Sequence, residues 1–206
     1  MENRKDGRLE ALWGGRFGDQ YSERNDNLFP NREPFWRHVF TLVKAESVLE
    51  IGCNVGSNLQ WIAKHLPGGR LSGIDINRQA LERAKQRLPG AELLLGSASK
   101  LPFPDGSIDF VFTTGLLIHL ESEMLPRVMA EAVRCSRRYV LCGEYFADTR
   151  IEVPYRGQEG ALFKDNYGQR YLDAFPSLEL LETGFLAKME NGWDDITYWL
   201  FEKRRA

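Results

Sequence analysis

Short apolar segments alternate with amphipathic stretches through the middle of the chain. Segments 47–51, 70–76, 92–95, 108–113 and 139–143 are apolar runs bounded by glycine, proline or polar residues, which predicts buried strands. In three of the intervals between them, apolar residues recur every three or four positions, as on one face of a helix: 55–66, 80–88 and 125–133. Strands that alternate with helices predict βαβ units and a parallel sheet covered on both faces.

Both ends of the chain depart from this alternation. Segments 178–182 and 196–201 have the pattern of strands with no helix between them, which predicts an antiparallel pair at one edge of the sheet. The first 45 residues are rich in arginine, asparagine and aromatic residues, and an apolar stripe over 33–43 indicates a helix. We therefore expect an α/β, doubly wound, Rossmann-like fold with a seven-stranded, mostly parallel sheet. A single domain would cover 1–206, with 1–45 as a helical arm or lid and 46–206 as the core.

The composition of the chain indicates which kinds of partner it is not expected to bind. The chain has 206 residues, and its 27 basic and 29 acidic side chains give a net charge of −2, so no bulk attraction to nucleic acid or to an anionic membrane is expected. The three cysteines are odd in number and form no C-x-x-C, which favours neither disulfides nor a metal site. The polar start and the absence of an apolar run of about 18 residues predict a cytoplasmic protein. Nothing in the sequence indicates an oligomeric state.

A glycine-containing turn follows the first predicted strand. In LEIGCNVGSNL, Gly52 and Gly56 permit a tight turn and close approach of a ligand to the backbone. Asp75 lies 75 − 52 = 23 positions after Gly52, at the end of the second strand, where a carboxylate can accept hydrogen bonds from both hydroxyls of a ribose. The dinucleotide pattern G-x-G-x-x-G needs a glycine where this chain has Asn54, which disfavours a nicotinamide-dependent oxidoreductase.

The string Glu50-x-Gly52-x-x-x-Gly56 resembles the first motif of class I S-adenosylmethionine (SAM)-dependent methyltransferases. This resemblance implies SAM as cofactor and S-adenosylhomocysteine (SAH) as product. It places Ser97 and the backbone of Ala98 at the adenine edge, and Arg24 is a candidate to meet the SAM carboxylate. The full set of expected cofactor contacts is Gly52, Cys53, Asn54, Gly56, Asn58, Asp75, Ile76, Ser97, Ala98, Thr114 and Arg24.

The second half of the chain resembles a narrower family, the pseudaminic acid biosynthesis-associated methylases. The strings TGLLIHL, RCSRRYVLCGEYF, VPYRGQEGALFKDNYG and DDITYWLFEK carry the resemblance, which runs from Phe17 to Ile196. It implies methyl transfer to a small polar acceptor, and a carboxylate-bearing nonulosonic sugar or its precursor is the acceptor class we expect. The alternative is a SAM-binding or scaffold protein of a sugar pathway that does not catalyse a reaction.

Three residues are catalytic candidates at the ends of the fourth and fifth strands. His119 is the candidate base, because histidine exchanges protons near neutral pH. Glu144 and Tyr145 end the fifth strand, where open α/β folds bind ligands, and either could orient the acceptor. A hydrogen-bonded structural histidine and a strand-end glutamate paired with an arginine are the competing interpretations.

Substrate contacts are expected from Tyr21, Arg156 and Lys164. Arginine suits a bidentate hold on a carboxylate, and Arg156 and Lys164 lie in a predicted long loop over 154–168. Solvated loop charges are the alternative for this pair, and an amphipathic arm packed on the sheet is the alternative for Tyr21.

Overall fold

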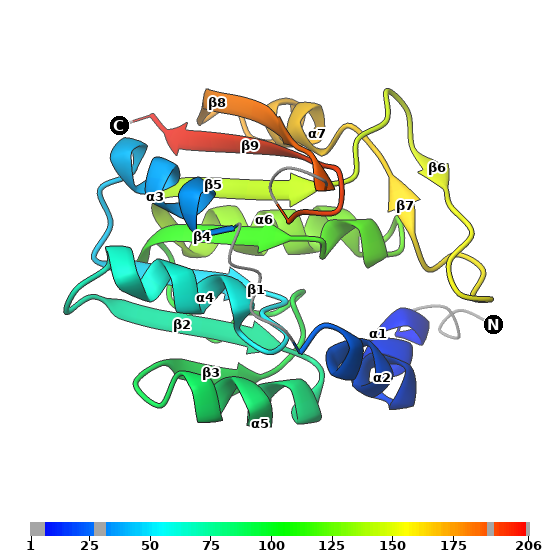
Figure 1. Ribbon diagram of the computed structural model, residues 1–206. Helices are drawn as coiled ribbons and strands as arrows, with labels where there is room; N and C mark the ends of the chain where they lie inside the picture. The colour runs from blue at the N-terminus through cyan, green and yellow to red at the C-terminus, as the bar shows by residue number, and fades with distance from the viewer. Residues whose placement is uncertain (1–6, 27–31, 189–191, 205–206) are drawn as a thin grey trace.

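A computed structural model describes residues 7–26, 32–188 and 192–204. A seven-stranded sheet forms its centre, in the order β3-β2-β1-β4-β5-β9-β8 (Figure 1). The strands are β1 (Ser47–Ile51), β2 (Arg70–Asp75), β3 (Glu92–Leu95), β4 (Ile108–Thr114), β5 (Ser136–Glu144), β8 (Leu178–Leu186) and β9 (Ile196–Lys203). All seven lie where the apolar pattern predicts a strand, and the predicted doubly wound fold is confirmed.

Strand direction is uniform except at one edge. β1, β2, β3, β4 and β5 pair in parallel, whereas β9 is antiparallel to both of its neighbours, β5 and β8. The antiparallel pair predicted for the C-terminal segments is therefore confirmed. The carboxyl ends of the parallel strands meet at one edge of the sheet, on the right in Figure 1.

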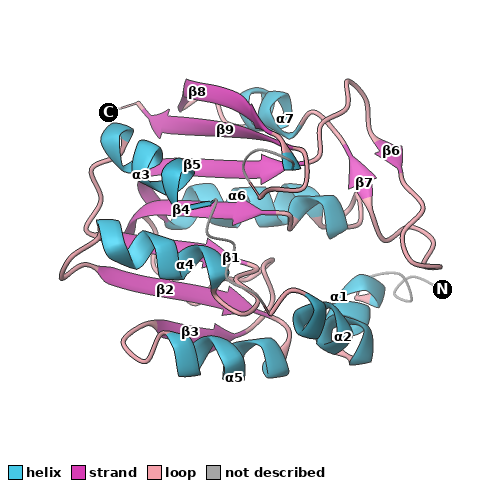
Figure 2. Ribbon diagram, in the orientation of Figure 1, coloured by secondary structure: helices cyan, strands magenta, loops and turns pink. Residues whose placement is uncertain are grey.

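Helices cover both faces of the sheet (Figure 2). On one face α3 (Glu33–Leu42), α4 (Ser57–Ile62) and α5 (Arg78–Arg87) bury an apolar cluster that includes Trp36, Leu59 and Leu81. On the other, α6 (Leu125–Cys135) and α7 (Tyr167–Ala174) bury a second cluster that includes Val128 and Tyr171. Each of these helices has apolar residues at three- and four-residue spacing, so one stripe is removed from water.

Two segments outside the sheet stand at its carboxyl edge. The first is the pair α1 (Arg8–Gly14) and α2 (Arg16–Arg24), which we call the arm. The second is a hairpin of β6 (Ile151–Glu152) and β7 (Phe163–Lys164), joined by an irregular tip. The prediction of one long loop over 154–168 is therefore wrong, because β7 and the start of α7 lie within it. Among the described residues, no helix is long and apolar enough to cross a membrane.

Candidate functional site

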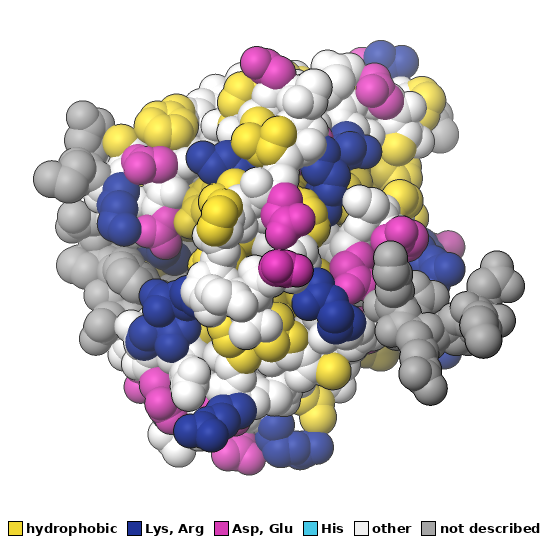
Figure 3. Space-filling model, turned by 90° about the vertical axis from the view of Figure 1, so that its right-hand side faces the viewer, with side chains coloured by type: hydrophobic (Ala, Val, Ile, Leu, Met, Phe, Trp, Pro, Cys, Tyr) yellow, Lys and Arg dark blue, Asp and Glu magenta, His cyan; other side chains and the backbone are white. Residues whose placement is uncertain are grey.

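A cavity of about 470 Å³ opens at the carboxyl edge of the sheet. Its walls come from the ends of β1, β2, β3, β4 and β5, from the arm, from the hairpin tip and from the loop between β8 and β9. Figure 3 views the molecule from this side, where basic and acidic side chains are interspersed with apolar ones. The cavity lies where ligands bind in open α/β sheets.

The turn after β1 has the backbone shape that its glycines allow. Gly52, Asn54 and Gly56 all have positive φ angles, of 77°, 46° and 74°. A Cβ atom on Gly52 would lie 2.9 Å from Leu116 Cδ1, so a larger residue would push on the far wall of the cavity. Asparagine tolerates the left-handed region better than most residues, which explains Asn54 between the two glycines. The turn therefore keeps its backbone open to the cavity.

A buried carboxylate lies beneath this turn. Glu50, at 1% exposure, accepts a hydrogen bond at Oε1 from Asn58 Nδ2 (2.7 Å), and Asn58 also donates to Thr114 Oγ1 (2.8 Å). Its other oxygen, Oε2, is buried and has no hydrogen-bond partner among the described residues. Burial raises the pKa of Glu50 to about 8. An unpaired buried carboxylate oxygen is costly, so this end of the cavity suits a cationic hydrogen-bond donor.

Arg32 closes the same end of the cavity. Its Nη1 donates to Asn58 Oδ1 (3.3 Å), its Nε donates to the carbonyl oxygen of Gly192 (3.2 Å), and its guanidinium lies 4.2 Å from the centre of the Trp193 ring. Burial lowers the pKa of Arg32. An arginine stands here beside Glu50, so the pocket offers both signs of charge to a ligand.

Asp75 ends β2 and is held in a fixed orientation. Its Oδ2 accepts from the backbone N–H of Asn54 and its Oδ1 from that of Asn77, each at 2.8 Å. Burial raises the pKa of this carboxyl. Each oxygen retains a lone pair, so the carboxylate can still accept from two further donors, such as the hydroxyls of a ribose.

The arm is attached to the core at the same place. Asn77 caps α5 by accepting from Ala80 N, and its Nδ2 donates to the carbonyl oxygen of Trp13 (3.1 Å) and to Asp19 Oδ1 (2.9 Å). Ser22, on α2, donates to Asn54 Oδ1 (2.7 Å). The arm is thereby bonded to both turns that border Asp75.

His119 also lines the cavity, from the short helix η3 (Leu117–His119). Its Nδ1 is 2.7 Å from the carbonyl oxygen of Ala161. Because a carbonyl oxygen only accepts, Nδ1 carries the ring proton and Nε2 remains an acceptor. Burial lowers the pKa of His119 to about 4. The ring is therefore neutral near pH 7 and is a weak base.

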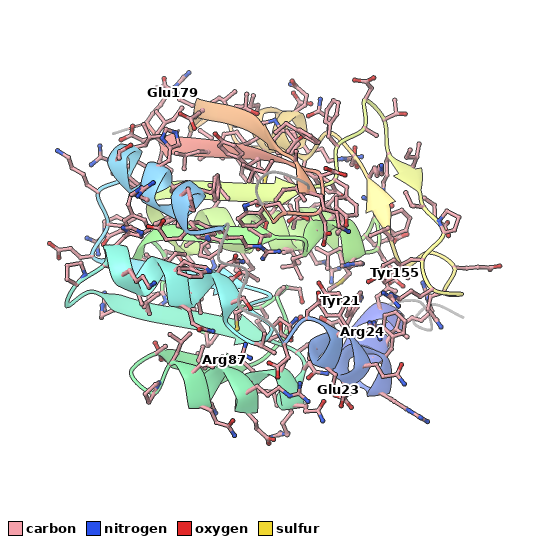
Figure 4. The ribbon with its side chains drawn as sticks, viewed as in Figure 1. Tyr21, Glu23, Arg24, Arg87, Tyr155 and Glu179 are labelled. Atoms are coloured by element: carbon pink, nitrogen blue, oxygen red, sulfur yellow. The ribbon has the colours of Figure 1, made fainter. Side chains whose placement is uncertain are left out.

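Aromatic side chains from the arm and the hairpin surround His119. The Trp13 ring centre is 4.3 Å from that of His119 and 5.2 Å from that of Tyr21, and Tyr155 is 5.3 Å from His119. Figure 4 shows Tyr21 on α2 and Tyr155 on the hairpin tip near each other. Arg156, beside Tyr155, has a positive φ of 49° and lines the cavity. A non-glycine residue in this region is strained, which is common where a side chain serves a site.

Most of the predicted site residues share this one cavity. The predicted residues that line it are Gly52, Cys53, Asn54, Asn58, Asp75, Ile76, Ala98, Thr114, His119, Tyr145, Tyr21 and Arg156. Their individual roles stay predictions.

Five predicted residues do not line the cavity. Gly56 supports the turn, and Lys164 lies on β7 with its Nζ 5.9 Å from the Tyr145 ring. Arg24 is exposed on α2 and does not line the cavity, whereas Arg32 does. Ser97 is hydrogen-bonded to Glu10 of the arm and 2.8 Å from Ser99 Oγ.

Glu144 requires a larger correction. It is fully buried, and it accepts from Thr113 Oγ1 (2.9 Å) and from the backbone N–H groups of Leu116 and Ile118 (both 3.3 Å). Burial raises its pKa to about 7. The carboxylate therefore holds the turn that carries His119 and does not line the cavity. Among the described residues no arginine is paired with it, contrary to the alternative interpretation.

Several cavity residues escape sequence reasoning. Glu10, Arg32, Lys188 and Trp193 line the cavity but stand in no recognised motif, and Asp194 lines it from the string DDITYWLFEK without having been assigned a role. The adjacent Asp194 and Asp195 indicate only a turn in the sequence. The nearest signal is the aromatic and arginine content of the first 45 residues, which marks that segment as unusual without assigning a residue.

Residues 48–138 match the family model described as "Methyltransferase domain". The matched segment contains the turn at Gly52, the buried Glu50 and Asp75, and ends within β5. The arm, the hairpin and β9 lie outside it.

Two relatives are similar to longer parts of the chain than the family model. An uncharacterized methyltransferase of Schizosaccharomyces pombe is 31% identical over 112 residues, which is 49% of this chain and 40% of the relative. The 2-methyl-6-phytyl-1,4-hydroquinone methyltransferase of a Synechocystis strain is 27% identical over 199 residues, which is 90% of this chain and 61% of the relative. The chain thus spans about half the length of these two proteins.

A solved structure places the fold. Magnesium protoporphyrin IX methyltransferase of Synechocystis, determined with bound SAH, superimposes with a TM-score of 0.70 at 12% identity, over 95% of this chain and 98% of that one. The chain therefore shares the Rossmann-like fold of this methyltransferase.

Proposed function

We propose that this chain is a SAM-dependent methyltransferase acting on a small polar, carboxylate-bearing acceptor. The observation that carries the proposal is that one cavity is lined by Glu50 and Asp75, from the ends of β1 and β2, and by His119 and Arg156, which lie at η3 and on the hairpin tip. The match of residues 48–138 to a methyltransferase domain supports SAM as the cofactor. The basic side chain of Arg156 supports an acceptor that carries a carboxylate.

The chain's own groups fit the parts of SAM. The unpartnered Oε2 of Glu50 suits the α-ammonium group, and the guanidinium of Arg32 suits the carboxylate. The fixed carboxylate of Asp75 suits the ribose hydroxyls. SAM supplies a methyl group on a sulfonium, which becomes a neutral thioether when an acceptor oxygen takes the methyl. The arm and the aromatic side chains around His119 exclude water and align the acceptor, and alignment supplies much of the rate in such a displacement.

The side chains proposed to bind the acceptor favour a carboxylate as the nucleophile. Burial raises the pKa of Tyr21 to about 12 and also raises the pKa values of Tyr145 and Tyr155, so all three hydroxyls stay protonated as donors. Arg156 adds a cation that can pair with the carboxylate of the acceptor. A carboxylate oxygen carries no proton at neutral pH, so it requires no general base, which agrees with the low pKa of His119.

The finer proposal is that the acceptor is a nonulosonic sugar or its precursor. It is supported by the sequence resemblance to pseudaminic acid biosynthesis-associated methylases, whose most specific string, YRG…LFK over 155–164, contributes Tyr155, Arg156 and Leu162 to the cavity. Such sugars carry a carboxylate and several hydroxyls, which the tyrosines and Arg156 can bind.

Calorimetric titration with SAH, with NAD as the control, tests the cofactor. Micromolar binding of SAH and no binding of NAD are expected; binding of NAD alone would contradict the proposal. Turnover on carboxylated sugars, followed as SAH release, then tests the acceptor. Tight SAH binding without turnover on any of them would favour a SAM-binding protein that does not catalyse a reaction.

A variant pair separates the two halves of the site. Arg156→Gln should raise the KM for the acceptor about tenfold, because a charged hydrogen bond is lost, and should leave SAH affinity unchanged. Arg127→Gln is the matched control, because Arg127 is exposed on α6 and lies outside the cavity. An equal loss of SAH affinity in Arg156→Gln would remove Arg156 from the acceptor half.

A further inference from the structure

We propose that Glu10, in the arm, is the hydrogen-bond acceptor that recognises the 6-amino group of the adenine ring. The inference rests on the proposed use of SAM. It assigns the purine specificity of the site to a residue outside the methyltransferase-domain match at 48–138.

The direction in which the base extends follows from the order of the strands. Glu50 and the turn at Gly52 belong to β1, Asp75 ends β2, and β3 is the next strand outward. With the amino-acid end of the cofactor at β1 and the ribose at Asp75, the base on the other side of the ribose must point toward the end of β3. There the cavity is lined by Gly96 and Ala98, and Gly96 N is bonded to the carbonyl oxygen of Asp75 (3.0 Å).

The residue expected to contact the base at this position is already engaged. Ser97 Oγ is hydrogen-bonded to Glu10 Oε1, lies 2.8 Å from Ser99 Oγ, and accepts from Ser99 N (3.1 Å). Ser97 does not line the cavity, whereas Glu10 does. The serine therefore orients the carboxylate, and Glu10 is the polar side chain presented to the ligand at this end.

The arm that carries Glu10 is firmly seated. Asn77 bonds both Trp13 and Asp19, and Ser22 bonds Asn54. The corner between α1 and α2 is closely packed, because a Cβ atom on Gly18 would lie 1.8 Å from the carbonyl oxygen of Trp13. Glu10 is thus held by contacts on both sides of Asp75, as a recognition residue must be.

A carboxylate at this position is expected to bind adenine in preference to hypoxanthine. A carboxylate offers only acceptors, so it can pair with the 6-amino group of adenine. It cannot pair with the 6-oxo group of hypoxanthine, and it repels that oxygen. A site built to bind an amino group strongly rejects an analogue that lacks one, because the buried polar group is then left unpaired.

Calorimetric titration with SAH and S-inosylhomocysteine, which differ at the 6-position, tests the proposal. The unaltered protein should prefer SAH by at least about tenfold. In Glu10→Gln the ratio should fall to within about twofold, because the amide can donate to the 6-oxo group as well as accept from the amine. A structural role of Glu10 would lower both affinities and leave their ratio unchanged, which would overturn the proposal.

Two further variants complete the design. Glu23→Gln is the matched control on the same arm: Glu23 is about half exposed and lies 3.7 Å from Arg83, away from the cavity (Figure 4). It should keep the original ratio. Ser97→Ala should also keep a preference for SAH; loss of the preference there but not in Glu10→Gln would make Ser97 the recognition residue and overturn the proposal.

The two proposals fail differently. Binding of SAH with no preference over the inosine analogue would overturn the role of Glu10 and leave the cofactor in place. Failure of the unaltered protein to bind SAH at all would overturn the proposed function, and the role of Glu10 with it.

Discussion

Glu50 is a carboxylate whose pKa lies far above that of the same group in an unfolded chain. Burial raises its pKa to about 8, against an ordinary value of 4.5. Between these values the folded protein binds more protons than the unfolded one, so the free energy of unfolding falls as the pH rises from about 4.5 to about 8. The stability lost by this group is complete above its folded pKa. Glu144, with a pKa near 7, contributes in the same direction.

The first prediction concerns this pH dependence. Glu50→Gln should be more stable than the unaltered protein above pH 8 by about 2 kcal/mol, with a smaller difference at pH 5. Urea unfolding at pH 5, 7 and 9 measures the difference. Glu144 is present in both proteins, so part of the slope should remain; an equal stability gap at every pH would show that Glu50 does not titrate in this range.

The second prediction concerns Asp75. Replacing it by alanine should weaken SAH binding by roughly 1–3 kcal/mol, because ribose hydroxyls would be buried without a partner. Calorimetry gives the change directly, and the far-ultraviolet spectrum checks that the turns bonded to Asp75 still fold. Asp173→Ala, on the exposed side of α7, is the control. Unchanged affinity in Asp75→Ala would remove the ribose assignment.

The third prediction separates acceptor classes through His119. With a carboxylate acceptor, His119→Gln should lower kcat by less than about tenfold, since general-base catalysis typically contributes a hundredfold or more. The rate should also show no titration of His119 between pH 5.5 and 8.5, because its pKa is about 4. A pH–rate profile of both proteins measures this. A hundredfold loss would indicate a hydroxyl acceptor whose proton His119 removes.

At the scale of elements, the arm and the sheet are joined by polar contacts around Asp75. Trp13 and Asp19 meet Asn77, and Ser22 meets Asn54, so the seating of α1 and α2 depends on the close corner at Gly18. The lid role expected for 1–45 can be tested at this corner without touching the sheet.

The fourth prediction follows from that corner. Gly18→Ala should open it, because its Cβ would overlap a backbone carbonyl, and overpacking of this kind costs about 1–3 kcal/mol. SAH affinity should fall by about tenfold while the thermal transition of the sheet stays within a few degrees. Gly14→Ala is the control, since its Cβ would meet nothing nearer than 3.4 Å. Equal SAH affinities in the two variants would separate the arm from cofactor binding.

At the scale of the whole molecule, the local apolar pattern predicts the strands of the sheet, but it does not predict α7 or the hairpin of β6 and β7. Each strand carries its apolar run within itself, so periodicity finds it. β8 extends to Leu186, beyond the predicted 182, because its later residues are fixed by pairing with β9. The sequence pattern does not predict α7, because only Tyr167, Gly168 and Tyr171 of its eight residues are buried. β6 and β7 have two residues each, too few to form a pattern.

The same distinction applies to the site. The turn at Gly52 and Asp75 are local to strand ends, so their spacing predicts them. Glu10 and Ser97 are 87 positions apart, and Arg32 and Asn58 are 26 apart, so only packing brings these residues together. Arg24 stands eight positions before Arg32, and nothing in the sequence shows which of the two arginines turns inward.

The hairpin has a consequence for how a site of this kind could change its ligand. Its two stems leave the molecule side by side, with Ile151 paired to Lys164 and Glu152 to Phe163, and Val153 N bonded to the carbonyl oxygen of Leu162. The loop between 153 and 162 therefore begins and ends at residues that are hydrogen-bonded to each other. If the proposed function holds, a loop of another length could replace 153–162 without disturbing these paired strands. Such a replacement would change the residues that contact the acceptor and would leave the cofactor-binding residues unchanged.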